Sequence, residues 1–287
     1  MSIVYLNGDF LPAVEARISP MDRGFLFGDG IYEVVPSYQG HFVGLVPHLE
    51  RMLSGLEQLS IEAGLSLADW QQLLTDLLAK NQSMGENLGV YLQVSRGTDV
   101  KRNHAFPANI RPTVFAFVFE IPPAPVADKD KAPRYRVVTA DDLRWQRCHI
   151  KSTSLLGNVL HYQQGYAQGA QETILFNREG FLTEAAACNV FVVKDGVIAT
   201  PPLSTELLPG ITRLILLAIL RKYSSYPVEE RAISRAEVLA ADEVWLTSSS
   251  KEVAPVVQIN DQWVGDGEPG NIWLDVQTLF SAHKYEF

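Results

Sequence analysis

Cysteine, positive charge and long apolar runs are all scarce in this sequence. Among its 287 residues only Cys148 and Cys188 are cysteines, so we expect no disulfide framework. Neither cysteine stands in a metal-ligand spacing such as Cys-x-x-Cys. We therefore expect no structural zinc and no other metal site.

The scarcity of positive charge restricts the partners of the chain. Its 24 lysine and arginine residues are outnumbered by 33 aspartate and glutamate residues, and the formal net charge is −9. This balance repels the phosphates of nucleic acids and of anionic lipids, so we expect neither a nucleic-acid nor a membrane partner. An anionic ligand has to be held in a pocket instead.

The longest apolar runs are far shorter than the roughly 20 residues that a membrane-spanning helix needs. Residues 1–5 also lack the basic start and apolar stretch of a signal peptide. These features predict a cytoplasmic protein.

Apolar residues make up 47% of the chain, which is ample for a buried core, and they follow the periods of secondary structure. Apolar segments at 3–6 and 10–11 flank Asn7-Gly8, a pair favoured in hairpin turns. Ser66, with Asp69 nearby, predicts the start of a helix. Other strands are expected near residues 31–35, 88–94, 113–119, 135–139, 173–176, 190–193 and 244–247, and helices near 49–59, 70–78, 155–167, 211–223 and 272–282.

A proline-rich and then charged segment, residues 121–133, is the best candidate for a domain boundary. Proline removes backbone donors, and alternating charges keep this segment solvated. We predict a small N-terminal α+β domain at 1–120, a linker at 121–133 and a larger C-terminal α+β domain at 134–287.

Lys151 is the first candidate for chemistry, because it lies at the expected passage from a strand into a helix, where side chains enter clefts. Burial and nearby cations such as Arg144 and Arg147 favour the neutral form of a lysine, which is the form that attacks a carbonyl group. Most lysines are solvated, however, so residue type alone favours a surface role.

Glu184 is the second candidate, because it precedes the small residues Ala185-Ala186-Ala187 at the end of an expected strand. A carboxylate there can keep a pyridine nitrogen protonated, while small side chains leave room for a planar ring. A solvated glutamate before a strand explains the same pattern equally well.

Two polar segments favour an anion site. Gly210-Ile211-Thr212 opens an expected helix, where free amides and the helix dipole attract anions. Residues 247–250 (TSSS) follow another expected strand and add hydroxyl groups. Helix capping and a polar turn explain each motif taken singly, whereas together they predict a phosphate cup.

A basic loop follows the expected strand that contains Tyr91. Its guanidinium and imidazole groups, Arg102 and His104, can together grip a carboxylate. A solvated surface loop is the competing interpretation.

Taken together, these motifs resemble the fold-type IV pyridoxal-phosphate enzymes, which comprise D-amino acid aminotransferases, branched-chain aminotransferases and aminodeoxychorismate lyases. The similarity runs nearly from end to end. Its marks are residues 22–33 (DRGFLFGDGIYE), 48–51 (HLER), 150–152 (IKS), 183–184 with 189–191, and 210–213 (GITR). The resemblance implies a two-domain α+β fold with the cofactor between the domains.

The resemblance also implies roles for the candidate residues, with pyridoxal 5'-phosphate as the cofactor. Lys151 carries the cofactor and moves the proton between the substrate α-carbon and the cofactor, and Glu184 pairs with the pyridinium nitrogen. The phosphate is held by Arg51, by the backbone amides of Ile211 and Thr212, and by Ser249, where related enzymes often have threonine.

Within the family, the D-amino acid aminotransferases are the most similar. Residues 102–104 resemble their Arg-x-His loop, which reaches the pocket of the neighbouring subunit and receives the substrate carboxylate, so a homodimer is implied. Tyr32 completes that carboxylate trap, and Val34 and Tyr91 are the other expected substrate contacts. Branched-chain enzymes tend to have Tyr-x-Arg on the preceding strand, whereas residues 91–93 here are YLQ.

The sequence thus predicts transamination of D-amino acids, such as D-alanine or D-glutamate, with 2-oxo acids in two half-reactions. The competing hypotheses are an aminodeoxychorismate lyase, a branched-chain L-amino acid aminotransferase, and a protein that only binds or stores pyridoxal phosphate. Two departures bear on specificity. The segment before Arg102 is one residue longer than usual, and Ala186-Ala187-Cys188 replaces a serine-rich run and so removes hydroxyl groups.

Overall fold

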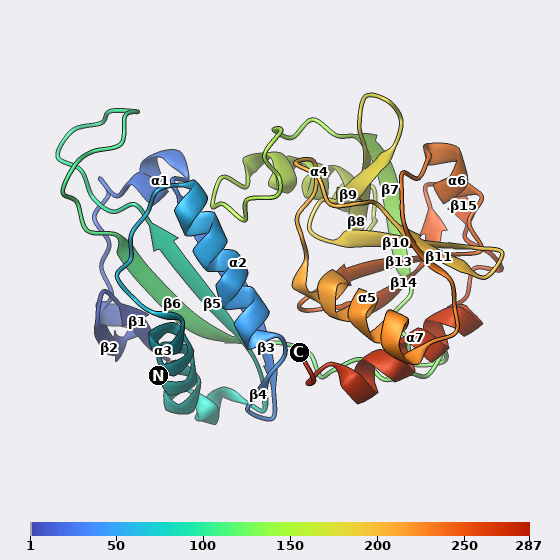
Figure 1. Cartoon of the computed structure of the whole chain (residues 1–287), viewed down its shortest axis with the longest axis horizontal. Helices are drawn as coiled ribbons and strands as arrows, with labels where there is room; N and C mark the ends of the chain where they lie inside the picture. Colours follow the sequence, from blue (N-terminus) through green and yellow to red (C-terminus); the bar gives the residue numbers. More distant parts are fainter. Residues whose placement is uncertain (1) are drawn as a thin grey trace. The chain divides into compact units, whose positions relative to one another are not determined.

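The computed structural model describes residues Ser2–Phe287, which form two compact units (Figure 1). Unit 1 contains the chain up to Pro123, the segment Ile150–Leu155 and Phe287, and unit 2 contains Ala124–His149 and Leu156–Glu286. None of the helices within these described residues is long and apolar enough to cross a membrane.

Unit 1 is built on a six-stranded sheet with the order β2-β1-β6-β5-β3-β4. The hairpin forms as expected, because Asn7 and Gly8 both adopt positive φ. The elements are β1 (Ile3–Leu6), β2 (Asp9–Pro12), a 3-10 turn (Ala13–Glu15), α1 (Arg23–Phe27), β3 (Gly30–Tyr38), β4 (His41–Phe42), α2 (Leu45–Gln58), α3 (Leu67–Lys80), a second 3-10 turn (Gln82–Met84), β5 (Asn87–Ser95) and β6 (Thr113–Glu120).

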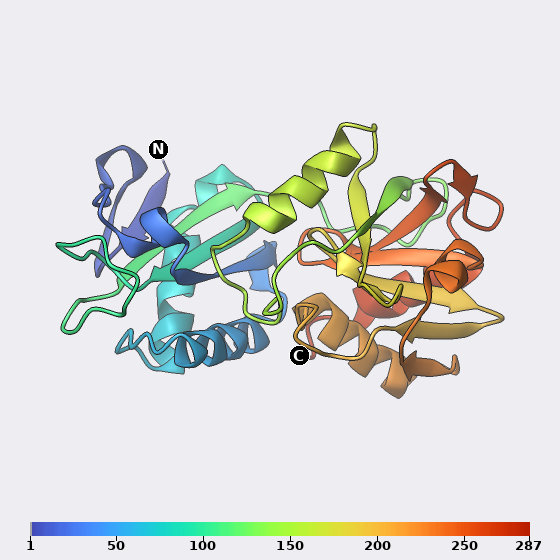
Figure 2. The ribbon, with the colours of Figure 1, turned by 90° about the horizontal axis from the view of Figure 1, so that it is seen from above.

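Helices α2 and α3 cover one face of this sheet (Figure 2). Their apolar stripes and the inward residues of β3, β5 and β6 form a core around Leu49, Met52, Trp70 and Leu74, all fully buried. Ser66 caps α3 and forms a capping box with Asp69, which confirms the expected helix start. The opposite face of the sheet remains open and holds half-buried aromatic residues.

Unit 2 is built on a nine-stranded mixed sheet with the order β12-β11-β10-β13-β14-β7-β8-β9, with β15 paired to β14. Helices α5 and α7 pack together against β13 and β14, and α4 packs on β7 and β8. The elements are β7 (Tyr135–Asp141), α4 (Leu156–Tyr166), β8 (Glu172–Phe176), β9 (Leu182–Ala185), β10 (Asn189–Lys194), β11 (Val197–Thr200), α5 (Ile211–Tyr223), β12 (Val228–Glu230), α6 (Arg235–Leu239), β13 (Glu243–Ser248), β14 (Glu252–Ile259), β15 (Gln262–Trp263) and α7 (Asn271–His283).

The short segment Ile150–Leu155 packs with unit 1, whereas the sequence predicts it to be part of the domain 134–287. Backbone hydrogen bonds explain this placement: Tyr32 N donates to Lys151 O at 3.1 Å, and Thr153 N donates to Gly30 O at 2.9 Å. The lysine lies between a strand and a helix, as the sequence predicts. It lies in an irregular segment between the end of β7 and the start of α4.

Candidate active site

Lys151 lies beside the open face of the unit 1 sheet. Its Nζ atom is 4.1 Å from the centre of the Tyr32 ring, and the side chain is half-buried. Across the described part of the chain, no carboxylate lies within ion-pair distance of this amine. A primary amine without a counter-ion is therefore presented beside an aromatic ring.

Three expected substrate contacts share this open face, because β3 and β5 pair in antiparallel register. Val34 lies directly opposite Tyr91, and Tyr32 lies opposite Gln93. The Tyr32 and Tyr91 rings stack with centroids 5.6 Å apart, and Tyr91 donates its hydroxyl proton to Gln93 Oε1 at 2.7 Å. Burial, reinforced by Tyr32, raises the pKa of Tyr91 to about 12, so this hydroxyl stays protonated at neutral pH.

A cavity of about 530 Å³ opens next to these residues in unit 1. Tyr91 and Gln93 line one side, the exposed Phe25 lines another, and Thr153 and Leu155 belong to the same segment as Lys151. The volume is sufficient for a small amino acid. Lys151 and Tyr32 are not among the lining residues of this cavity.

Glu33 points to the other face of β3 because side chains alternate along the strand, and Arg51 of α2 binds it there. The Arg51 Nε and Nη2 atoms donate to both oxygens of Glu33, at 2.8 and 2.6 Å, and His48 Nδ1 lies 2.7 Å from Glu33 Oε2. Burial alone would raise the pKa of Glu33, but Arg51 and His48 outweigh burial and lower it to about 2. A permanently ionised carboxylate thus holds the guanidinium in one orientation.

Arg102 and His104 are exposed on the loop between β5 and β6. Both contact the Phe27 ring of α1: the Arg102 guanidinium is 5.0 Å from its centre, and the His104 ring is 5.3 Å away. Within the residues that the structure describes, no hydrogen bond or ion pair joins either side chain to Lys151 or Tyr32. Within one copy, the contacts described for these two side chains are with α1.

Glu184 lies at the end of β9 in unit 2 and is buried. Arg144 Nη1 donates to its Oε1 at 2.5 Å, and Oε2 accepts from Leu208 N at 3.1 Å and from Asn189 Nδ2 at 3.3 Å. Burial raises the pKa of Glu184 to about 7, although Arg144 opposes this rise. The carboxyl group is thus a buried acceptor that titrates near neutrality.

Arg144 is itself held by a second carboxylate. Its Nε and Nη2 atoms donate to Asp142 at 3.0 and 2.7 Å. From the sequence, Arg144 is expected to be one of the cations that favour a neutral Lys151. The structure instead shows that two carboxylates balance its charge.

The start of α5 lies close to Glu184 in unit 2. Asn189 Nδ2 also donates to Leu208 O at 2.9 Å, and a Cβ atom on Gly210 would lie 2.0 Å from Asn189 Oδ1. A larger residue there would require the Asn189 side chain to shift. The amides of Ile211 and Thr212, in the first turn, have no acceptor within the helix, and both residues are buried.

A second strand end reaches the same region of unit 2. Thr247 pairs in register with Asn189, and its buried hydroxyl has no hydrogen-bond partner among residues 2–287. Ser249 follows in the turn after β13. An unpartnered buried hydroxyl and free first-turn amides fit a bound anionic ester such as a phosphate.

The loop Ala186-Ala187-Cys188 follows Glu184 directly. Glu172 Oε1 accepts from Ala187 N at 2.7 Å and fixes the turn. Burial raises the pKa of the Cys188 thiol to about 12, so it remains a small neutral side chain. The loop therefore offers little polarity in place of the serine hydroxyls of related enzymes.

Comparison with known proteins decides the family. The sequence profile of the amino-transferase class IV family matches residues 30–259. The chain belongs to the class IV aminotransferases. This family uses pyridoxal phosphate, and so the predicted fold, enzyme class and cofactor are confirmed.

Curated relatives of this class IV aminotransferase match over nearly its whole length. It is 38% identical over 275 residues to the D-alanine aminotransferase of Bacillus licheniformis, covering 96% of this chain and 94% of the relative. It is 35% identical over 284 residues to the D-alanine aminotransferase of Staphylococcus haemolyticus, covering 99% and 98%.

Solved structures show the same fold at lower identity. The branched-chain aminotransferase of Thermoproteus uzoniensis, with norvaline, matches with a TM-score of 0.87 at 21% identity, covering 99% of this chain and 95% of that one. The branched-chain amino acid aminotransferase of Escherichia coli matches with a TM-score of 0.87 at 22% identity, covering 98% and 93%.

The sequence patterns did not indicate roles for several residues that bind and orient the candidate site residues. Glu33 and His48 stand inside the family motifs, but the alternation of β3 is needed to see that they face Arg51. Asn189 donates hydrogen bonds both to Glu184 and to the Leu208 carbonyl group just before α5, and no local sequence pattern predicts these contacts. The buried Asp142-Arg144 pair had one signal, two opposite charges just after an expected strand.

Proposed function

We propose that the chain is a homodimeric aminotransferase that moves the amino group of a D-amino acid, such as D-alanine or D-glutamate, to a 2-oxo acid in two half-reactions. One observation carries the proposal. The open face of β5 presents Tyr91 and Gln93 and no arginine, so a substrate carboxylate needs a guanidinium from another element. Arg102, on the loop that follows β5, supplies it. The relatives named D-alanine aminotransferase support the same substrate class.

Residues of both units would hold the cofactor. Lys151 and Arg51 come from unit 1, and Glu184, the amides of Ile211 and Thr212, and Ser249 come from unit 2. When bound, pyridoxal phosphate supplies an aldehyde that bonds to amines and a pyridinium ring that accepts electron density as a Cα–H bond breaks. The free amides of α5 and the unpartnered Thr247 hydroxyl are suited to hydrogen-bond a phosphate. The buried Glu184 carboxylate is suited to pair with a protonated ring nitrogen.

Lys151 has two tasks in this proposal. Its amine would hold the cofactor covalently, and when not so engaged it would take up and return the proton at the substrate α-carbon. The absence of a carboxylate within ion-pair distance, across residues 2–287, leaves its lone pair available when the amine is neutral. Tyr32 limits the positions that the amine can adopt.

Glu184 would accept a hydrogen bond from the protonated ring nitrogen. Its pKa of about 7 belongs to a carboxyl group with no ring cation beside it. A cationic N–H donor favours the carboxylate form and so opposes the rise in pKa that burial causes. The Arg144-Asp142 pair keeps the carboxyl group oriented for this contact.

A second copy of the chain would complete the carboxylate trap, because within one copy the Arg102 and His104 side chains pack on Phe27 and, among residues 2–287, no hydrogen bond joins them to Tyr32. The surface supports such an assembly. Helix α4 leaves Leu156, Val159, Leu160 and Tyr166 more than half exposed, at 71%, 56%, 62% and 66%. An apolar stripe of this kind is typical of a subunit interface.

Matched panels of D- and L-amino acids test the proposal directly. Each is added to the holoenzyme while the visible absorbance of the bound cofactor is followed. We expect conversion with D-alanine or D-glutamate and little with the L-forms. Conversion by branched-chain L-amino acids alone would assign the branched-chain activity instead.

Two further measurements test the lyase and storage hypotheses. Release of pyruvate from aminodeoxychorismate without an amino acceptor would identify a lyase, and failure of every amino donor to change the absorbance would indicate a storage protein. Lys151→Ala should abolish the visible absorbance. The cytoplasmic location stays a prediction.

A further inference from the structure

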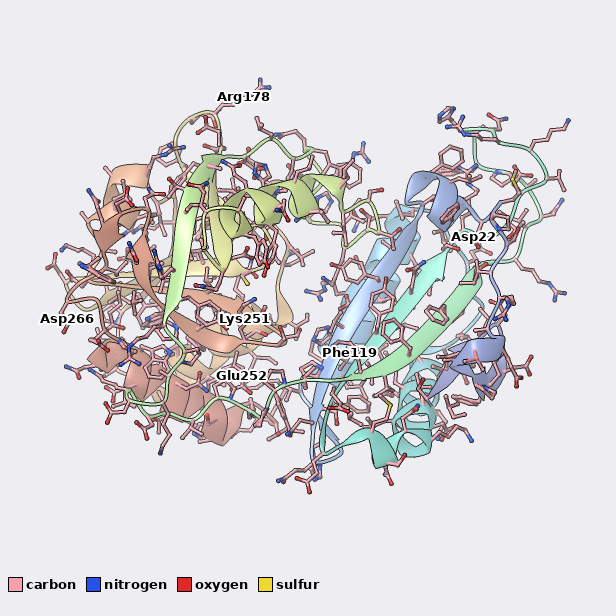
Figure 3. All side chains as sticks on the ribbon, turned by 180° about the vertical axis from the view of Figure 1, so that it is seen from behind. Asp22, Phe119, Arg178, Lys251, Glu252 and Asp266 are labelled. Carbon is pink, nitrogen blue, oxygen red and sulfur yellow. The ribbon has the colours of Figure 1, made fainter. Side chains whose placement is uncertain are left out.

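The loop that carries Arg102 and His104, residues 96–112 and here called the trap loop, is attached to α1 at both its base and its tip. At the base, Ser95 and Thr113 are paired neighbours on β5 and β6. Asp22 accepts a hydrogen bond from each hydroxyl, at 2.7 Å from Ser95 and 2.6 Å from Thr113. One buried carboxylate therefore ties the two ends of the loop together (Figure 3).

The neck of the loop is closed just beyond that point. Arg23 N donates to Gly97 O at 2.9 Å, and Asp22 forms a bridge with Thr98. Gly97 has φ +103°, and a Cβ atom there would lie 1.9 Å from Arg111 O. The two sides of the neck are therefore in backbone contact, and all of the loop's reach comes from residues 98–110.

Arg23 then reaches the tip. Its guanidinium is buried and donates to Asn103 O at 2.5 Å and to His104 O at 3.3 Å, while Nε donates to Asp29 Oδ2 at 2.8 Å. Asp29 also binds Arg96 at 2.8 and 3.0 Å. The Arg23 guanidinium therefore donates to the backbone carbonyl groups of two consecutive residues, Asn103 and His104.

The Phe27 ring supports the side chains of the tip. Arg23, Arg102 and His104 lie 4.8, 5.0 and 5.3 Å from its centre. Stacking on an aromatic ring restricts a long guanidinium side chain that is otherwise exposed. Backbone and side chains of the tip are thus fixed by one five-residue helix.

We propose that Asp22, Arg23 and Phe27 are positioning residues for the substrate carboxylate: they hold the trap loop so that Arg102 and His104 are presented to the site of the second subunit. This inference rests on the proposed function. The three residues touch neither substrate nor cofactor. They act by removing the conformational freedom of the loop before the carboxylate arrives.

Two variants with matched controls test the inference. Arg23→Ala removes the grip on the tip, and Arg17→Ala is its control, because Arg17 also donates to two backbone carbonyls, those of Val14 and Ala16, but lies outside the loop. Phe27→Leu removes the ring and keeps the Arg23-Asp29 ion pair. Phe181→Leu, 41% exposed and in unit 2, is its control.

We expect the KM for D-alanine and for the 2-oxo acid to rise by roughly tenfold or more in both test variants, with kcat within about threefold of wild type and the cofactor absorbance unchanged. Trypsin should also cut after Lys101 or Arg102 faster in Arg23→Ala than in Arg17→Ala. Arg23→Lys, which keeps the charge but not the two-pronged grip, should recover only part of the KM.

The outcomes separate the inference from the proposed function. If Arg102→Ala raises KM while Arg23→Ala and Phe27→Leu behave like their controls, the positioning role is wrong and the carboxylate trap stands. If Arg102→Ala also leaves KM unchanged, the trap itself is wrong. A lower kcat, a higher KM and less bound cofactor, all together in both test variants, would overturn the inference. Such a result would mean that these residues stabilise the fold as a whole.

Discussion

Single residues in this enzyme owe their properties to burial and to one or two partners. Glu184 and Glu33 have the same side chain, yet burial dominates at Glu184 and raises its pKa to about 7, whereas Arg51 and His48 dominate at Glu33 and lower its pKa to about 2. The first carboxyl group is suited to receive a new cationic donor. The second is already committed to a guanidinium.

Glu184→Gln tests the role of the first carboxyl group. The amide cannot stabilise a protonated ring nitrogen, so we expect the activation free energy to rise by about 2 to 4 kcal/mol. This rise corresponds to a kcat that is lower by roughly 30- to 1000-fold. Rapid mixing of the holoenzyme with D-alanine measures the first half-reaction. Glu179→Gln, at an exposed turn, is the control. Equal rates in the two variants would remove Glu184 from the mechanism.

Glu33→Gln tests the role of the second carboxyl group, that of Glu33. Because the folded-state pKa of Glu33 lies below its value of 4.5 in the unfolded chain, its stabilisation is complete above pH 4.5 and is lost as pH falls toward 2. The loss amounts to about 3 kcal/mol. Urea unfolding between pH 6 and pH 3 should therefore show a shallower pH dependence in Glu33→Gln than in wild type. Glu120→Gln, exposed on the same sheet, should keep the wild-type slope.

At the level of elements, the sequence predicted long periodic segments well. Helix α5 has the expected bounds, 211–223, because its apolar residues recur at helical spacing and Gly210 precedes them. Helix α1 was missed. Five residues are too few to show a period, and α1 forms because Asp22 caps its start and Gly28, at φ +66°, ends it.

The candidate site was predictable only in part for a related reason. The motifs marked Lys151, Glu184 and the start of α5, which are local signals. The contacts of Glu184 with Arg144 and Asn189, and of Arg23 with the trap loop, join segments far apart in sequence. No periodicity encodes them, so the chain has to be folded before they can be seen.

The entrance of α5 supplies a prediction at this scale. Gly210→Ala places a Cβ atom against Asn189 and should displace the first-turn amides, so we expect the dissociation constant for pyridoxal phosphate to rise by roughly tenfold or more. Fluorescence titration of the apoenzyme measures it. Gly169→Ala is the control, because φ there is +76° but no atom lies within 4 Å of the added Cβ. Unchanged affinity would exclude α5 as a phosphate site.

For the whole molecule, the proposal makes the dimer part of the chemistry. If Arg102 serves the site of the other subunit, a Lys151→Ala subunit can lend its intact loop to an Arg102→Ala subunit. Each parent variant should be nearly inactive at low substrate concentration. Co-expression of the two in equal amounts should restore about a quarter of wild-type activity, because half of the dimers are mixed and each has one complete site.

Size-exclusion chromatography with light scattering should accompany that measurement and should give a dimeric mass. A monomeric mass in a fully active preparation would contradict the borrowed loop. If the mixture shows only the sum of the parent activities, Arg102 acts within its own subunit or not at all.

Unit 1 is made mainly of two separate segments of the chain, and this has a consequence for biogenesis. Residues up to Pro123 leave the ribosome first, but the Ile150–Leu155 segment that bonds to the start of β3 follows only after β7 has been made. If Lys151 holds the cofactor, as proposed, a nascent chain has no amine in place for it until synthesis has passed Leu155. Cofactor capture would then be deferred to a late stage of maturation, when much of the second unit is emerging.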